Sequence, residues 1–505
     1  MAGLIARLFR RKATFAPPPP APPRPRPAAR SYAMSTVDRL SADFRAPIST
    51  ADAELRYSLQ VMRARARELS RNNDYAKRFL SLVKNNVIGP RGIQLQMRVK
   101  NPDGTMDEKA NAAIERAWSA WGHAGFCTAD GRLSWVDAQR LFVETLARDG
   151  EVLVRKVPGF ANPFRFALQF VEADHLDESL DNVLRDGRRL KMGVEVNEWD
   201  RPVAYWLRSK HPGEYTYAGQ MPDQYQRHPA ETLIHKYLVE RPTQTRGVPW
   251  MHTPAARMHI LNKYEEAELV ASRVAAAKMG FFTKEKGTAA GFAGDDTDDD
   301  GNTITEAAPG TFQELPAGMD FKPFDPEHPT ANFDAFCKGI LRGICAGLDV
   351  SYTGLTGDLT AVNYSSIRAG LLDERDAWRF LQYWTIEHFC LPIFTEWLWL
   401  ALLAGAIPGL PVAKYDKFLA PEFRPRGWAW VDPEKDASAS EKAIGAGLNT
   451  YTEVLAEQGR DFEDTVAQLA YERKALTAAG IPLLNPAGPA KPKEKADEKD
   501  AQDQG

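Results

Sequence analysis

At 505 residues the chain exceeds the usual size of one hydrophobic core, so two or more packing units are expected. Its 44% hydrophobic and 26% charged content is ordinary for a soluble globular protein. The formal net charge of −3 conceals an asymmetry, because residues 1–100 carry 20 Lys+Arg against 6 Asp+Glu, whereas the remainder carries 44 against 61. The acidic bulk argues against a protein that grips DNA tightly by neutralising phosphates. The basic front end either contacts nucleic acid or another acidic surface, or is a solvated arm.

The cysteines and the N-terminal segment exclude further classes. The four cysteines form no Cys-x-x-Cys pair and no zinc spacing with histidine, so buried reduced thiols are expected at Cys127, Cys337, Cys345 and Cys390. Apolar and basic residues are interleaved in Met1–Lys12, which predicts no secretory signal. This stretch is amphipathic, so a docking helix, a frayed terminus and a membrane-surface anchor all remain open.

Residues 1–40 are expected to form a disordered, Pro-rich basic arm, because the segment 13–30 cannot pack a core. Apolar residues then recur at helical spacing over Ala51–Asn86. Glycines and a proline end this helical region, and Ile93–Val99 alternates like a strand.

Residues 108–122 and 134–148 are predicted to be helices, after which Asp149 and Gly150 turn into a strand at Glu151–Val157. Asn197–Pro202 has the composition of a hairpin turn. The chain from Glu151 to Leu238 is therefore predicted to form the β part of an α+β unit. Further short strands are predicted at Phe164–Val171, Gly193–Val196, Val203–Arg208 and Thr232–Leu238.

A long Ala-rich helix is predicted from Thr253-Pro254, a hydroxyl cap followed by proline, to Gly280. An irregular, partly acidic segment follows at 283–328. A second helix is predicted at 332–347, with an apolar face formed by Phe333, Phe336, Ile340 and Ile344.

Leu348–Asn363 is predicted to be a Gly-containing loop, and a helix of about 40 residues, kinked at Pro392, is predicted from Tyr364 to Ala404. Its end, Phe389–Ile407, is apolar, but Pro392 and Glu396 favour a buried helix over a membrane span. A strand at Gly427–Val431 and a disordered charged tail are expected beyond it. Two more helices are predicted at 436–458 and 461–479.

Tests for chemistry give no convincing active site. The acidic run Asp295–Gly301 starts like an EF-hand loop, but Ala307 stands where the closing Glu should fall, and Glu306 is one residue early. The chain has no P-loop motif, and Leu153 stands where a nuclease placing Glu151 on a strand would need Lys. His235, His252 and His259 are too widely spaced to share a metal without other ligands. We therefore predict no catalytic residue, no metal and no cofactor.

Four short segments in order resemble the lambda-type portal protein family of tailed bacteriophages over about residues 40–480. Each segment alone is weak, but four in the correct order are specific. The Pro-rich arm looks individual to this chain, and a fused protease is lacking. The segments are Arg63–Asn73 (continued by Asn86–Gly89 and Gly92–Gln96), Arg241–Pro249, Tyr364–Leu372 and Trp430–Pro433.

The resemblance implies an α+β portal fold assembled as a ring. It implies a division of the chain into a wing at 41–252, stem helices at 253–281 and 332–347 with a clip at 282–331 between them, a tunnel loop at 348–363, a long tunnel or wing helix at 364–404, a wing return at 405–435, crown helices at 436–480 and a disordered tail at 481–505.

The resemblance also implies a function and partners. The implied function is a dodecameric channel at one capsid vertex for DNA packaging and ejection. The protein would be located in the virion and, during assembly, in the host cytoplasm. Expected partners are double-stranded DNA, the terminase large subunit, the major capsid and scaffold proteins and head-completion or adaptor proteins, with no small-molecule substrate. The alternative is a membrane-associated phage scaffold or assembly protein without a channel role. Flotation with liposomes distinguishes the two.

Candidate site residues follow from the same division. The predicted tunnel loop contains no Lys or Arg, so it is expected to act sterically, as a sleeve or valve past which DNA slides. Arg368, one turn into the next helix, is the nearest cation for a phosphate, although an inter-subunit ion pair fits it equally well. The expected channel residues are Asp349, Tyr352, Leu355, Asp358, Tyr364 and Arg368. The expected inter-subunit residues of the stem are Ala267, Glu268, Ala271 and Arg273.

Overall fold

The structure, a computed structural model, divides into two units, Met1–Ser49 and Thr50–Gly505. All elements below belong to the second unit. The predicted N-terminal arm, and the C-terminal tail apart from Ile481, lie outside the described residues. Those residues are 48–214, 223–276, 280–284, 296–297, 303–304, 319–323, 332–360, 364–428, 433–460 and 462–481.

Three helices open the described chain: α1 (Ala51–Leu55), α2 (Leu59–Asn72) and α3 (Asp74–Val83). The predicted helical region is confirmed, but Asn73 interrupts it with an extended backbone. The Asn73 side chain accepts a hydrogen bond from the Ala76 amide at 3.0 Å and so caps α3. A π-helical turn, Lys84–Ile88, follows α3 and ends at Gly89, whose φ is 73°.

The next two helices match their predicted spans. They are α4 (Glu108–Trp121) and α5 (Trp135–Asp149). Ser134 and Asp137 form a capping box at the start of α5, and Gly150 ends this helix in the left-handed conformation.

Two antiparallel sheets follow, which confirms the α+β class. In the first sheet, β2 (Glu151–Pro158) lies between β3 (Phe166–Val171) and β9 (Leu233–Tyr237). The second is a meander in sequence order, and its third and fourth strands are joined at 197–201, within the turn predicted at Asn197–Pro202. Its strands are β4 (Asn182–Val183), β5 (Arg189–Lys191), β6 (Val194–Val196), β7 (Pro202–Arg208) and β8 (Tyr225–Pro229). Short 3₁₀ turns lie at Ala173–His175, Ala230–Thr232 and Val412–Lys414.

A two-stranded sheet joins the front of the chain to a segment more than 300 residues later. Strand β1 (Gln94–Met97) pairs antiparallel with β14 (Pro421–Arg424), with Leu95 opposite Phe423. The sequence predicted β1 but placed the later strand at Gly427–Val431. Gly427 and Trp428 are not in a strand, and 429–432 lie outside the described residues.

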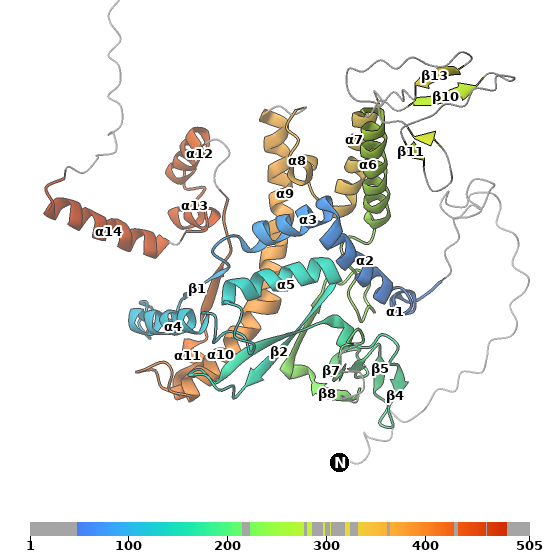
Figure 1. The fold of residues 1–505 in the computed structure, drawn as a ribbon. Helices are drawn as coiled ribbons and strands as arrows, with labels where there is room; N and C mark the ends of the chain where they lie inside the picture. Colours follow the sequence, from blue (N-terminus) through green and yellow to red (C-terminus); the bar gives the residue numbers. More distant parts are fainter. Residues whose placement is uncertain are drawn as a thin grey trace, which may run out of the picture. The chain divides into compact units, whose positions relative to one another are not determined.

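Helices α6 (Ala255–Ala276) and α7 (Phe333–Leu348) lie side by side (Figure 1), with the Tyr264 ring 5.1 Å from that of Phe336. The prediction that the first helix reaches Gly280 is wrong, because a strand begins there: aromatic and β-branched residues favour extended backbone. The predicted irregular segment also contains paired strands. These are β10 (Gly280–Lys284) with β13 (Met319–Pro323), and β11 (Asp296–Thr297) with β12 (Thr303–Ile304).

The apolar face predicted for α7 is confirmed except at Phe336. Ile344 is buried, Phe333 and Ile340 pack against the core, and Phe336 is 50% exposed. The buried residues are Cys337, Leu341, Ile344, Cys345 and Leu348.

A short helix, α8 (Tyr352–Thr356), interrupts the predicted loop, and a long helix then runs through α9 (Tyr364–Thr385) and α10 (Leu391–Leu403). The predicted irregularity in this helix lies earlier than Pro392. A π-helical turn at Ile386–Cys390 joins the two parts, and Pro392 sits in the first turn of α10. Proline cannot donate the helical hydrogen bond, and the wider π turn accommodates its ring.

The C-terminal part contains α11 (Tyr415–Phe418) and then three helices instead of the two predicted. Glycines at 445 and 447 end the first of these, and a capping box between Thr450 and Glu453 starts the second. The three helices are α12 (Pro433–Gly445), α13 (Tyr451–Glu457) and α14 (Phe462–Ala478).

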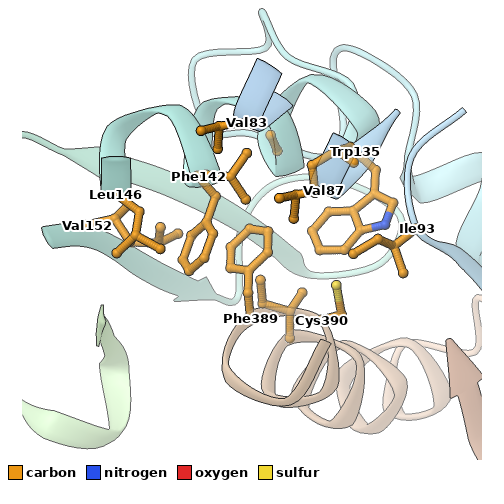
Figure 2. Close-up of a cluster of buried hydrophobic side chains, with 14 of the residues drawn as sticks. Val83, Val87, Ile93, Trp135, Phe142, Leu146, Val152, Phe389 and Cys390 are labelled. Atoms are coloured by element: carbon orange, nitrogen blue, oxygen red, sulfur yellow. The ribbon is translucent and has the colours of Figure 1, made fainter. Parts of the chain in front are cut away.

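The main core forms where α3, α5, β2 and the π turn of the long helix meet (Figure 2). Phe389 stacks on Phe142 at 4.1 Å and on Trp135 at 5.2 Å. All four cysteines are buried and unbonded, as predicted. Within the described residues one helix, Gly370–Leu403, is long enough to cross a membrane and contains an 18-residue stretch with a mean hydropathy of 1.3. Because Phe389, Ile393 and Trp397 of this helix are buried in the core, we interpret it as a core helix.

Candidate channel segment and its supports

The segment predicted to be the tunnel loop is an ordered turn–helix–turn over its described residues, 348–360. Asp349 ends α7 in the left-handed conformation at φ 55°. The hydroxyl of Ser351 accepts a hydrogen bond from the Gly354 amide at 3.1 Å and thereby caps α8. Gly357, at φ 74°, ends α8. The segment is therefore locally fixed up to Thr360, and 361–363 lie outside the described residues.

Positive groups from other elements surround this segment, although its own sequence has none. Lys338 of α7 lies 3.8 Å from the Asp358 carboxylate, and the Arg342 guanidinium lies 6.0 Å from the centre of the Tyr352 ring. Arg78 of α3 donates a hydrogen bond to the Gly354 carbonyl at 3.1 Å. The hydroxyl of Thr360 donates to Asp358 and, with Lys338, lowers the pKa of that carboxyl. The acidic character expected from the sequence is thus partly compensated.

The expected channel residues separate into two groups. Leu355 is only 3% exposed and belongs to the main core, so the expectation that it lines a channel is wrong: it anchors α8. Asp349 is exposed, and Tyr352 and Asp358 are partly exposed and joined by a hydrogen bond of 3.3 Å. Tyr364 and Arg368 lie in the first turns of α9, and their side chains are outside the described set.

The expected stem residues differ in how exposed they are. Ala267 and Arg273 are exposed and Ala271 is half-buried, so these three remain available to a neighbouring copy. Glu268 is 8% exposed within its own chain, which leaves it little surface for a neighbour. Close packing at the base of the pair depends on Gly347, where a Cβ would lie 3.0 Å from the Thr253 hydroxyl.

A buried charge cluster, which the sequence analysis missed, centres on Glu151 at the start of β2. Glu151 is fully buried and accepts hydrogen bonds from Arg63 of α2 at 3.0 Å, from Arg246 at 2.5–3.1 Å and from His235 of β9 at 2.9 Å. Burial alone would raise the pKa of Glu151, but the charge of Arg246 and the hydrogen bond of His235 outweigh it, and that pKa falls far below its ordinary value. The cluster joins helix, sheet and loop through charges that are buried at its centre.

The loop Arg241–Pro249 is built around Arg246. This guanidinium is fully buried and also donates to the carbonyls of Leu176 at 2.8 Å and Met192 at 3.1 Å. Gln244 donates to the Arg246 carbonyl at 2.7 Å and holds the loop from within. Two of the four segments that carried the family resemblance thus supply Arg63 and Arg246 to one carboxylate. The sequence held one signal for this cluster. Two of the family segments each contain an arginine, and a buried arginine requires an acidic partner.

His235 should make the fold less stable at mildly acidic pH. Burial lowers the pKa of His235 below its ordinary 6.5, against the opposing effect of Glu151. The unfolded chain therefore binds more protons than the folded one between the folded pKa and about 6.5, and this part of the stability is lost as pH falls below about 6.5. Chemical denaturation at pH 7.5 and 5.5 should show a smaller difference for His235→Gln than for the wild type. Burial and Arg155 also lower the pKa of His228, so its protonation changes the stability in the same direction. His228→Gln is therefore the comparison variant. Equal pH dependence in the His235 variant and the wild type would contradict this assignment.

Two groups of acidic residues are candidates for metal binding. Ligand atoms of Glu172, Asp174 and His211 lie within 4.8 Å of one another. Arg67 already pairs with Asp174 at 2.6 Å and with Glu172 at 3.6 Å, so this group is an ion-pair network and does not resemble a metal site. Of the acidic run that starts like an EF-hand loop, Asp296 lies in strand β11, and residues 298–302 are outside the described chain.

The chain is similar to portal proteins of tailed phages. The family model described as "Phage portal protein, lambda family" matches residues 37–382. The probable portal protein of Halomonas phage phiHAP-1 is 36% identical over 465 residues, covering 91% of this chain and 89% of its own. Portal protein B of Escherichia phage lambda is 23% identical over 494 residues, with 86% and 87% covered.

Among solved structures, the neck of an empty gene transfer agent (GTA) particle matches with 13% identity and a TM-score of 0.42, covering 84% of this chain and 98% of that one. The family match spans the charge cluster, the α6–α7 pair and the channel segment. The chain therefore belongs to the lambda family of phage portal proteins.

Proposed function

We propose that about twelve copies of this portal protein form a ring at one capsid vertex, and that double-stranded DNA passes through it during packaging and ejection. The observation that carries the proposal is the family match over residues 37–382, supported by the relative in Halomonas phage phiHAP-1. The role is structural and not catalytic. In this proposal α6 and α7 form the stem, 282–331 the clip, 348–363 the loop beside the DNA and 436–480 the crown.

The proposed partners follow from this division of the chain. The clip contacts the terminase large subunit during packaging and the head-completion or adaptor proteins afterwards, while the wing contacts the major capsid and scaffold proteins. Exposed apolar residues of α6 support subunit contact, because Ile260, Leu269 and Val270 are 63%, 72% and 57% exposed in the single chain. Electron microscopy of the purified protein should show rings, and a monomer under all assembly conditions would contradict the proposal.

The channel segment is best tested by a point change. Deleting Gly354–Leu359 would also remove the buried Leu355, so a packaging defect would not identify the surface beside the DNA. Leu359 is 63% exposed next to Asp358. Leu359→Lys should leave rings intact but slow packaging, because each new Lys–phosphate contact retards sliding. Raising salt from 50 to 200 mM should relieve the slowing by about threefold per contact. Packaged DNA length against time is the measurement.

Leu359→Gln is the matched control, since it is polar but uncharged and should package at the wild-type rate. If the Lys and Gln variants package equally at every salt concentration, the segment does not lie beside the DNA.

A further inference from the structure

The turn Asn197–Arg201, which joins β6 to β7, carries an exposed tryptophan. Trp199 is 81% exposed in the single chain, which leaves most of a large apolar ring in water. The turn beneath the ring is fixed. The Asn197 side chain accepts hydrogen bonds from the amides of Trp199 and Arg201, both at 3.0 Å, and Asp200 pairs with Arg189 of β5 at 2.8 Å. Because the turn is already ordered, Trp199 can bind a partner at a small cost in conformational entropy.

A pocket of about 790 Å³, which we call the α10 pocket, opens at the C-terminal end of α10. Leu400 and Leu403 line one side of it, and Leu403 is 55% exposed. The connection between β2 and β3 lines the other side with Asn162 and Arg165. Asn162 fixes this connection by donating to the carbonyl of Phe166 at 2.8 Å. The α10 pocket is therefore a preformed concave surface with exposed apolar groups.

The tryptophan and the α10 pocket lie far apart within one chain. Asp200, next to Trp199, borders the same cavity as Trp384 of the long helix. Leu400 of the α10 pocket comes about 16 residues after Trp384, roughly 24 Å further along the helix at 1.5 Å per residue. Figure 1 shows the sheet of β4–β8 to the right and α10 to the left. Trp199 therefore cannot enter the pocket of its own chain, but a second copy can bring the two together.

The charges beside the two features are opposite in sign. Glu198, which precedes Trp199, is exposed and forms no ion pair within the part of the chain that the structure describes. Arg165 of the α10 pocket is also exposed, and no carboxylate of the described residues pairs with it. Arg201 of the turn has the same sign as Arg165, so the favoured orientation places Glu198, and not Arg201, against Arg165.

We propose that Trp199 of one copy fills the α10 pocket of the next copy in the ring, with Glu198 beside Arg165. Each chain then offers one tryptophan and one pocket at different places on its surface, which is the head-to-tail arrangement that closes into a ring. A tryptophan seated in a pocket, with charges at the rim, is a common centre of binding energy in protein interfaces. The inference rests on the proposed function, which supplies the ring.

Crosslinking of purified rings tests this contact while Trp199 and the leucines of the pocket stay in place. Glu198→Cys and Arg165→Cys, combined in one chain, put two thiols across the proposed interface, and the four native cysteines are buried. A short thiol-specific bismaleimide should join the copies into a ladder of covalent multimers on a denaturing gel. The control combines Glu198→Cys with Arg71→Cys, at an exposed arginine in the last turn of α2, and should give no ladder.

Trp199→Ala should make the rings dissociate more readily. Loss of a tryptophan that anchors an interface should raise the protein concentration at which rings and monomers are equally populated by about 30-fold. Sedimentation over a dilution series is the measurement. Tyr57→Ala is the matched control, because Tyr57 is an aromatic residue that is 83% exposed and lies outside the proposed contact. It should leave the ring population at the wild-type level.

Rings that give no ladder from the Glu198 and Arg165 cysteine pair, or the same ladder from the control pair, would overturn the inference. So would a crosslink that joins the two thiols within one monomer. Trp199→Ala rings of wild-type stability that fail to enter capsids would assign Trp199 to a different protein and would also overturn it. If the wild type forms rings without the ladder, only this inference fails, whereas a wild type that forms no rings contradicts the proposed function itself.

Discussion

Replacing Glu151 by Gln should lower the free energy of unfolding by about 3–5 kcal/mol, because it leaves the buried Arg246 guanidinium without its carboxylate, whereas Arg63 keeps its ion pairs with Asp174 and Glu178. Glu151 is the one carboxylate that Arg246 contacts at 2.5 Å, and its side chain is fully buried with those of Arg63 and Arg246. Gln preserves the size of the side chain, but its N–H₂ replaces an oxygen that accepts hydrogen bonds, so the loss combines the charge with broken hydrogen bonds. Urea denaturation of wild type and variant at pH 7.5 is the measurement.

The control for this prediction is Glu54→Gln, the same chemical change at an exposed ion pair with Arg241, whose side chains are 55% and 46% exposed. It should cost less than about 1 kcal/mol, because water screens such pairs. A Glu151 variant no less stable than the Glu54 variant would show that the cluster holds the sheet to α2 by packing alone.

Gly150→Ala should lower the free energy of unfolding by about 2–5 kcal/mol. One part, about 1–2 kcal/mol, is the cost of a side chain in the left-handed conformation, since φ at Gly150 is 85°. The other part is overlap: an added Cβ would lie 2.6 Å from the Val248 carbonyl oxygen and even closer to the Val248 carbon and Pro249 nitrogen. These are backbone atoms of the loop that carries Arg246, so they cannot move aside without disturbing the charge cluster.

Gly104 offers a matched control for this change. Its φ is 86°, yet nothing lies within 4 Å of an added Cβ. Gly104→Ala should therefore show only the conformational cost, about 1–2 kcal/mol. Thermal or urea unfolding of the two variants side by side separates strain from overlap. Similar losses would show that the contact between Gly150 and the Val248–Pro249 backbone relaxes freely.

The sequence determined the elements whose signals are local. Periodic apolar residues gave α4 and α5 nearly to the residue. Alternation and turn residues gave the strands around the 197–201 turn. Local sequence also identified the family, because the four short segments occur in the family's order along the chain.

Errors arose where one local pattern allowed two outcomes. In α7 spacing placed Phe333, Ile340 and Ile344 against the core, but it did not show that Phe336 stays half exposed beside Tyr264 of α6. At the end of α6 the helical pattern continued, but pairing of Gly280–Lys284 with Met319–Pro323 replaced it. Tertiary and sheet contacts overrode propensity in both places.

The sequence by itself therefore determined that this chain is an α+β protein of the portal family, with a long apolar helix after a Gly-containing segment. Only the tertiary structure decided that Leu355 of that segment is buried, that Lys338, Arg342 and Arg78 surround it, and that Arg63 and Arg246 share Glu151. The physical reason is the range of the interactions. Caps and periodicity act within a few residues, whereas burial and charge pairing join residues some 88 and 95 positions apart at Glu151.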